Sequence, residues 1–178
     1  MKTEISIFFL LSLFVFSCQN DDDGIVAGPQ MIYQTSFENN DVFDVSGWEG
    51  SGFSSASDTP FEGGSFSLQL EPQWLPQEGA LERNFTGLEG DLSFDLQFYS
   101  KTIDWEGIVQ VWKVDAEGNT QPLITQTLNE AEWTAQRITF PSIFTPEEQL
   151  FLKFSAGGTE VATGKVLIDL VQFKILNP

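Results

Sequence analysis

The sequence predicts an all-β fold, a sandwich of two β-sheets with jelly-roll topology. Two observations carry this prediction. From Met31 onward, short runs alternate between apolar and polar residues, and no segment has the period of an amphipathic helix. Turns rich in Gly, Pro, Asn and Asp separate these runs. About ten short strands without helices are typical of a two-sheet sandwich.

The expected strands follow one another along the chain with few residues between them. A first strand is expected at 31–37 and a second at 52–56, and the run 65–70 places Phe66, Leu68 and Leu70 on one face. Further strands are expected at 79–85, 91–100, 107–114, 121–128, 132–140, 149–156 and 165–175.

The run from Asp91 to Ser100 has the clearest alternation in the chain. Its apolar residues point one way and its polar residues the other. The inward set is Leu92, Phe94, Leu96 and Phe98, and the outward set is Ser93, Asp95, Gln97 and Tyr99. This strand is therefore expected to have one face in the core and one in solvent.

The N-terminus has the pattern of an export signal that ends in a cysteine. The run Ile5–Phe16 is almost wholly apolar, and Cys18, the single cysteine of the chain, follows it. About 12 apolar residues are too few to span a bilayer, which takes about 20. The segment resembles a bacterial lipoprotein precursor, cut before Cys18 and lipidated there. An ordinary secretory signal beside a stray cysteine is the alternative.

Three segments follow from this interpretation: a signal peptide at 1–17, a lipid-anchored acidic tether at 18–30 and a β-sandwich domain at 31–178. The run Asp21–Asp23 resembles the acidic tract that directs some Gram-negative lipoproteins to the outer face of the outer membrane. We therefore expect a lipid-anchored protein of the outer membrane, exposed on the cell surface. A solvated linker is the alternative and is compatible with this expectation.

Charge and composition narrow the functions further. The chain has 8 basic and 26 acidic residues and a net charge of −18, which disfavours nucleic acid and anionic membrane surfaces as partners. It has no histidine. Ser-His-Asp and Cys-His catalysis and zinc sites of the His/Cys type are therefore not expected. A metal would be held by oxygen atoms, which indicates calcium.

Several short motifs, taken in order, resemble the galactose-binding-like jelly rolls of bacterial carbohydrate-binding modules and related surface lipoproteins. The resemblance covers about residues 31–176. The motifs are Ser36-Phe37-Glu38, Gly47-Trp48, Gly63-Gly64-Ser65, Ser67-Leu68, Phe98-Tyr99-Ser100-Lys101, Trp133, Phe140 and Val166-Leu167-Ile168-Asp169. The resemblance implies a jelly roll and a glycan ligand. The fold hosts many functions, so it supports the fold more than the ligand.

The resemblance also implies a structural calcium ion held by Glu38 and Asp169 between the first and last strands. Asp169 lies between Ile168 and Leu170 in an apolar strand, where a carboxylate is costly without a cation or donors. The family often has a second Asp where this chain has Leu170, which weakens the expected site. The alternative is that Asp169 accepts hydrogen bonds from a loop.

Polar and aromatic side chains provide candidates for a sugar-binding surface. If strands 91–100 and 107–114 are adjacent, their outward residues form one patch, comprising Asp95, Gln97, Tyr99, Gln110 and Trp112. Inward packing of Val109 and Val111 is one of two possible parities for the second strand. The loop residues Trp74 and Trp105 are further candidates. Core or edge packing is the alternative for each ring and the favoured interpretation for Trp48 and Trp133.

The sequence therefore predicts a non-catalytic, lipid-anchored surface protein that captures a neutral oligo- or polysaccharide. A structural or adhesive lipoprotein that binds another surface protein is the alternative. A glycoside hydrolase needs only a pair of carboxylates, but short turns leave little chain for a deep cleft. An enzyme is therefore the least favoured of the three.

Overall fold

The computed structural model of the chain describes residues 28–72, 79–156 and 164–178. The expected signal peptide, Cys18, most of the tether and Trp74 lie outside these residues. All secondary structure in the described part is β-strand, as predicted. The strands are β1 (Gln30–Thr35), β2 (Glu38–Asn39), β3 (Val42–Phe43), β4 (Glu49–Ser51), β5 (Phe53–Ala56), β6 (Ser67–Leu70), β7 (Gly79–Phe85), β8 (Gly90–Ile103), β9 (Gly107–Val114), β10 (Thr120–Leu128), β11 (Thr134–Phe144), β12 (Gln149–Ala156) and β13 (Lys165–Ile175).

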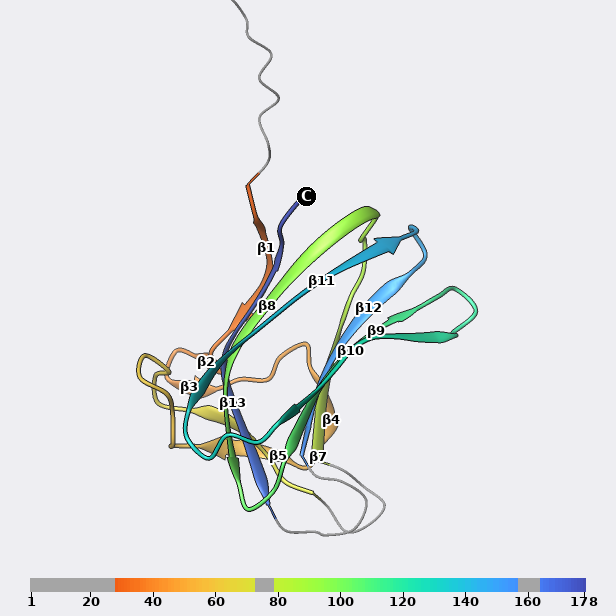
Figure 1. Cartoon of the computed structure of the whole chain (residues 1–178). Helices are drawn as coiled ribbons and strands as arrows, with labels where there is room; N and C mark the ends of the chain where they lie inside the picture. Colours follow the sequence, from red (N-terminus) through yellow and green to blue (C-terminus); the bar gives the residue numbers. More distant parts are fainter. Residues whose placement is uncertain (1–27, 73–78, 157–163) are drawn as a thin grey trace, which may run out of the picture.

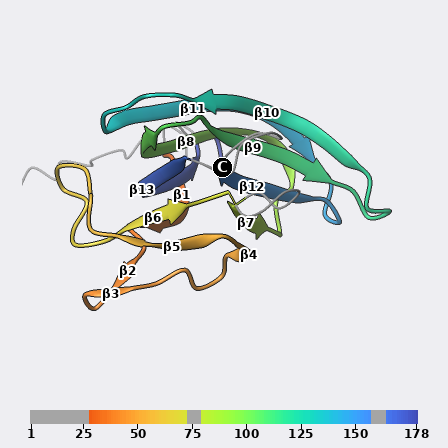
Figure 2. The ribbon, with the colours of Figure 1, turned by 90° about the horizontal axis from the view of Figure 1, so that it is seen from below.

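The strands form two antiparallel sheets that pack face to face (Figure 1). The first sheet has the order β11-β8-β13-β6-β5, and β1 pairs with β13. The second sheet has the order β10-β9-β12-β7-β4. The short β2–β3 hairpin lies on the same side as β4 and β5, away from β10 and β11 (Figure 2). This arrangement confirms the predicted jelly-roll sandwich.

The core lies between the two sheets and is built from the residues that alternation predicts. In β8, Leu92, Phe94, Leu96 and Phe98 are all buried. Phe94 stacks on Phe140 of β11 and on Phe173 of β13, at centroid distances of 5.1 Å and 5.5 Å. Full burial of one such side chain contributes about 1.5–3 kcal/mol, so a core of this kind can stabilise the domain without disulfides.

Val109 and Val111 of β9 are fully buried, which resolves the parity that the sequence leaves open. Gln110 and Trp112, which alternate with them, therefore point out of the second sheet. Trp48 is also a core residue, as expected. Its indole N–H donates to the hydroxyl oxygen of Tyr33 at 2.7 Å.

Each predicted strand is present, with ends that differ from the prediction by a few residues. The largest difference is β11, which extends to Phe144 through Pro141. Proline lacks the N–H that a ladder needs, but β11 is an edge strand of the first sheet and can tolerate it. The strands β2, β3 and β4 were not predicted, because runs of two or three mostly exposed residues show no alternation.

No helix in the described residues has the length and apolar character needed to cross a membrane.

Candidate functional site

The outer face of the second sheet presents a row of polar side chains that crosses four strands. Gln110 of β9 lies opposite Thr125 of β10 on one side and Lys153 of β12 on the other. Lys153 in turn lies opposite Glu82 of β7. Facing residues of antiparallel strands project from the same face of the sheet, so these four side chains lie on one surface. They provide an amide, a hydroxyl, an ammonium and a carboxylate group.

An aromatic row runs beside the polar one. Trp112 of β9 lies opposite Phe151 of β12, and Pro122 of β10 lies opposite Trp112 on the other side. The Trp112 and Phe151 rings are stacked, with centroids 5.7 Å apart and planes inclined by 7°. Both rings are partly exposed. The row therefore forms an apolar strip in a polar surface.

The polar row, together with Trp112 and Pro122 of the aromatic row, lines a hollow of about 440 Å³, which we call the sheet groove. Phe151 stacks on Trp112 beside this hollow. The residues that line the groove are Glu82, Gln110, Val111, Trp112, Thr120, Pro122, Ile124, Thr125 and Lys153. A volume of this size is within the range of small-molecule pockets, about 300–1,000 Å³. Apolar rings beside amide and hydroxyl groups suit a ligand with both C–H faces and hydroxyl groups.

Asp95, Gln97 and Tyr99 do not belong to this groove, so the expectation of a single patch is wrong. Their strand, β8, is in the first sheet, whereas β9 is in the second. The outward residues of the two strands therefore lie on opposite outer faces of the sandwich. Adjacency in sequence suggested that the strands pair, but the jelly-roll connection carries the chain from one sheet to the other.

Hydrogen bonds within the first sheet occupy Asp95. Arg137 of β11 donates to both of its carboxylate oxygens, from Nε at 2.8 Å and from Nη2 at 3.2 Å. Gln97 donates to Oδ2 at 2.6 Å. Burial acts to raise the pKa of Asp95, but these hydrogen bonds outweigh it and hold the pKa below its usual value. Asp95 therefore has an evident structural role.

The other candidate tryptophans have separate environments. Trp105 lies in the turn between β8 and β9 and is half-buried, and its indole N–H has no partner among the described residues. It packs against Gly164, where an added Cβ would collide with the Trp105 side chain. Trp133 donates from Nε1 to Oδ1 of Asp58 at 2.8 Å, a contact that ties two loops together. Trp74 lies outside the described residues.

No local pattern in the sequence singles out Glu82 and Lys153, which complete the groove, or Phe151, which stacks on Trp112 beside it. A signal for Phe151 exists, because Leu150, Leu152 and Phe154 alternate with it and claim the core face. That signal places Phe151 outward but does not reveal its neighbour. The pairing of β12 with β9 is a contact between distant segments that local patterns do not encode.

Glu38 and Asp169, the expected calcium ligands, lie against the same glycine pair. An added Cβ on Gly63 would collide with Oδ2 of Asp169, and one on Gly64 would collide with the carboxylate of Glu38. Oε1 of Glu38 accepts the backbone N–H groups of Ser65 and Phe66. β1 pairs with β13, and Glu38 follows β1 closely enough for its charge to act on the carboxyl group of Asp169.

The environment of Asp169 fits a bound cation. Its side chain is fully buried, and although Oδ1 accepts the backbone N–H of Leu170 at 2.7 Å, Oδ2 has no partner within the described part of the chain. Burial, together with the nearby negative charge of Glu38, raises the pKa of Asp169 to about 7. The described residues contain no cluster of three or more His, Cys, Asp or Glu side chains, so backbone carbonyls would have to complete a calcium shell.

No protein-family model matches the chain, and no curated protein matches its sequence. Solved structures are similar in fold. The CBM22-1 xylan-binding domain of Paenibacillus barcinonensis Xyn10C is 14% identical with a TM-score of 0.59, and the match covers 85% of this chain and 97% of that one. The C-terminal family 22 carbohydrate-binding module of Clostridium thermocellum Xyn10B is 15% identical with a TM-score of 0.57, covering 82% and 94%.

A family 16 carbohydrate-binding module is similar at 14% identity and a TM-score of 0.51, with 72% of this chain and 90% of that chain covered. At these identities the similarity concerns the fold. This chain has the jelly-roll β-sandwich fold that these carbohydrate-binding modules share.

Proposed function

We propose that the protein is a non-catalytic glycan-binding domain that is held at the cell surface by a lipid on Cys18. The observation that carries the proposal is the sheet groove, in which Trp112, stacked on Phe151 beside the groove, adjoins a row of polar side chains. The rings can pack on the C–H faces of sugar residues, while Gln110 and Thr125 exchange hydrogen bonds with hydroxyl groups. Structural neighbours that bind xylan support the same class of ligand.

A neutral polysaccharide is the expected ligand. Lys153 lies between Glu82 and Gln110, so the single cationic side chain that lines the groove faces a carboxylate across the strands. With a net charge of −18, the protein repels polyanions. A groove of this kind gives few desolvated contacts, and we expect dissociation constants on the order of 10 µM to 1 mM.

A binding role also agrees better with the groove than catalysis does. Hydrolysis of a glycosidic bond requires two carboxyl groups that flank the bond. Among the described residues that line the groove, Glu82 alone carries a carboxylate.

Substitution of Trp112 tests the proposal. The full-length protein, purified in a detergent without a sugar headgroup, is titrated with soluble xylan, β-glucan and galactan by calorimetry. Trp112→Ala should weaken binding about tenfold, because it removes the centre of the apolar strip. The melting temperature should change little, since the ring is on the outer face.

Phe61→Ala is the matched control, because Phe61 is an aromatic residue that is 93% exposed and lies outside the groove. It should bind like the wild type. If no polysaccharide binds the wild type, or if both variants bind alike, the groove does not bind glycan, and a surface protein becomes the preferred partner.

The anchoring proposal rests on the apolar run that precedes Cys18. In a Gram-negative host the protein should incorporate labelled fatty acid and partition into detergent, and Cys18→Ser should abolish both. Labelling that persists in this variant would contradict anchoring at Cys18. Accessibility to protease on intact cells then tests whether the domain is exposed on the outer membrane.

We further propose that Glu38 and Asp169 hold a structural calcium ion with the help of backbone carbonyls. The support is the unpartnered Oδ2 of the buried Asp169 and the position of both carboxylates against Gly63 and Gly64. A bound calcium would neutralise the two charges and fix the loop that precedes β6 to the last strand.

A further inference from the structure

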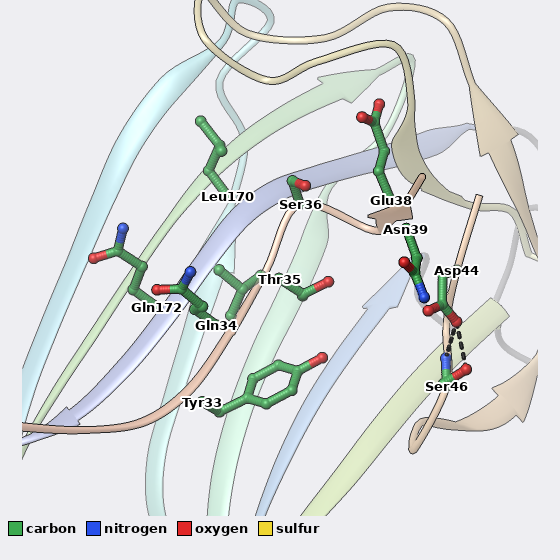
Figure 3. A pocket seen from close by; sticks show the side chains of 11 residues that line it. Tyr33, Gln34, Thr35, Ser36, Glu38, Asn39, Asp44, Ser46, Leu170 and Gln172 are labelled. Carbon is green, nitrogen blue, oxygen red and sulfur yellow. Dashed lines mark hydrogen bonds between the residues drawn. The ribbon is translucent and has the colours of Figure 1, made fainter. Parts of the chain in front are cut away.

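A second hollow, of about 470 Å³, lies along β1 (Figure 3). It belongs to the first sheet, because β1 pairs with β13, whereas the sheet groove belongs to the second. No residue lines both hollows. We call it the β1 pocket. Its lining residues are Tyr33, Gln34, Thr35, Ser36, Glu38, Asn39, Asp44, Ser46, Leu170, Val171 and Gln172.

Two glutamines form one wall of the β1 pocket. Gln34 of β1 and Gln172 of β13 are directly opposite each other in the ladder, and their amides lie side by side in Figure 3. Neither side chain makes a hydrogen bond to another described residue, whereas the next glutamine in the row, Gln97, is bound to Asp95. Each free amide offers two N–H donors and one carbonyl acceptor.

The opposite wall, across β1, is made by the segment that follows the β2–β3 hairpin. Oδ1 of Asp44 accepts hydrogen bonds from the backbone N–H and the hydroxyl of Ser46, at 2.8 Å and 2.5 Å. The backbone N–H of Asp44 donates to the carbonyl of Phe37 at 2.8 Å. Phe37 is fully buried against Trp48, which fixes this segment to the core. The wall is therefore held in place before any ligand arrives.

The floor of the β1 pocket is the strand itself. Within the described residues β1 pairs with β13 alone, so one of its edges keeps backbone groups without a strand partner. Ser36 adds a hydroxyl group there, whereas the hydroxyl oxygen of Thr35 already accepts the backbone N–H of Phe37 at 2.8 Å. Leu170 supplies a small apolar portion, since Val171 is fully buried.

The chemistry of the lining selects the ligand. None of the 11 lining residues is Lys or Arg, and two, Glu38 and Asp44, carry carboxylates, which disfavours phosphate, sulfate or carboxylate groups as ligands. Amides and hydroxyls that both donate and accept, beside a small apolar portion, match a neutral polyhydroxylated molecule. The volume is within the range of small-ligand pockets, about 300–1,000 Å³.

We propose that the β1 pocket is a second saccharide site, which takes one neutral sugar residue through the amides of Gln34 and Gln172. The site goes beyond the proposed function of the sheet groove, because it lies on the other sheet and shares no residue with it. A sugar bound there would hydrogen-bond to both amides.

Side-chain amide signals allow a direct test. The full-length, ¹⁵N-labelled protein in a detergent without a sugar headgroup is titrated with D-xylose, D-glucose, D-galactose and D-mannose in the presence of calcium. At least one sugar should shift the NH₂ signals of Gln34 and Gln172. The double variant Gln34→Ala/Gln172→Ala should weaken binding of that sugar about tenfold, the loss expected for one or two hydrogen bonds.

Two controls keep the result specific. Gln121→Ala removes an exposed glutamine of β10 that lines neither hollow, and it should leave the affinity unchanged. Trp112→Ala should also bind the sugar at the β1 pocket, even if it abolishes binding of polysaccharide in the groove. A melting curve of the double variant separates loss of the site from loss of the fold.

Two outcomes would overturn the proposal. One is that no sugar shifts the Gln34 and Gln172 signals. The other is that they respond to calcium alone, which would make the pocket an extension of the cation site at Glu38. Neither outcome bears on polysaccharide binding by Trp112, so the two proposals fail independently.

Discussion

Asp95 and Asp169 are both buried carboxylates, yet their neighbours shift their pKa values in opposite directions. Burial opposes ionisation of each. At Asp95 hydrogen bonds from Arg137 and Gln97 outweigh that cost and lower the pKa. At Asp169 the single backbone donor, Leu170, does not outweigh the cost of burial. Glu38 adds a like charge, so the pKa of Asp169 rises to about 7. The same residue type is thus a satisfied structural ion in one sheet position and a candidate cation ligand in another.

Removal of the Arg137 side chain should destabilise the fold. Arg137→Ala leaves the carboxylate of Asp95, whose side chain is 3% exposed, with Gln97 as its remaining side-chain donor. We expect a loss of about 1–3 kcal/mol in the free energy of unfolding near neutral pH. Because the native pKa of Asp95 lies below the unfolded value near 3.8, this contribution is present above that value and disappears as the pH falls through the native pKa.

Urea unfolding of the wild type and of Arg137→Ala across the acidic range measures this difference. The gap between the two proteins should be widest near neutral pH and should close below about pH 4. Equal stability at neutral pH would show that the Arg137–Asp95 pair contributes nothing. Polysaccharide affinity should not change, because the pair lies on the face opposite the groove.

Asp169 should make stability depend on pH in the opposite sense. In calcium-free protein its native pKa of about 7 exceeds the unfolded value of 3.8, so the native state binds more protons between the two. The contribution is complete below about pH 4 and is lost as the pH rises through 7, and it is on the order of 4 kcal/mol at most. Calcium competes with the proton and should restore stability at the higher pH.

Thermal melts with chelator or calcium, at about pH 5 and about pH 8, test both parts. Calcium should raise the melting temperature more at the higher pH. Asp169→Asn should remove both the pH dependence and the response to calcium. A calcium response that Asp169→Asn retains would place the ion elsewhere.

At the scale of the strands, alternation predicted both position and orientation. The inward side chains of β8 are Leu92, Phe94, Leu96 and Phe98, as expected, because burial of apolar groups fixes one face of a strand. The pairing of strands was not predictable in the same way. Sequence neighbours β8 and β9 lie in different sheets, so the polar residues expected to form one patch are divided between two faces.

The candidate sites show the same limit. Gln110 and Trp112 were predicted because they are polar or aromatic at outward positions. Phe151, which completes the aromatic strip, was missed because it is 39 residues away in sequence and meets Trp112 only through the β9–β12 ladder. Asp169 was expected from the resemblance, and the residues around it supported that expectation independently, since a carboxylate in an apolar strand is an evident local conflict.

Substitution in the turn between β5 and β6 tests whether this turn supports the cation site at Asp169. Gly63→Ala should displace the turn, because the added Cβ would meet Asp169 Oδ2 and the Pro60 ring. We expect a lower melting temperature and a weaker response to calcium. The matched control is Gly87→Ala, which has a positive φ of 72° but no atom near its added Cβ. Its calcium response should equal that of the wild type, and equal responses in both variants would contradict the role of the turn.

On the scale of the whole molecule, the two sheets have different surroundings. The second sheet carries the sheet groove on its outer face. The first sheet carries Asp95, the candidate cation site and the β1 pocket, and its last strand contacts all three. Two ligands, one in the sheet groove and one in the β1 pocket, could therefore bind at the same time without touching each other.

The single-sided pairing of β1 has a mechanical consequence. This strand is the first described element after the expected tether, and β13 is its one strand partner in the described part of the chain. Tension between a lipid anchor and a captured polysaccharide would load this ladder first, and the irregularity between Met31 and Tyr33 weakens its outer end. Phe37 lies two residues after β1 and is fully buried, so it would stop further separation of β1 from β13.

Single-molecule pulling on the N-terminal side should therefore release a short segment, about 3.4 Å for each residue freed, at a lower force than the one that ruptures the sandwich. If the anchor and the groove act as proposed, a sudden pull would extend this N-terminal strand while the glycan stays bound in the groove.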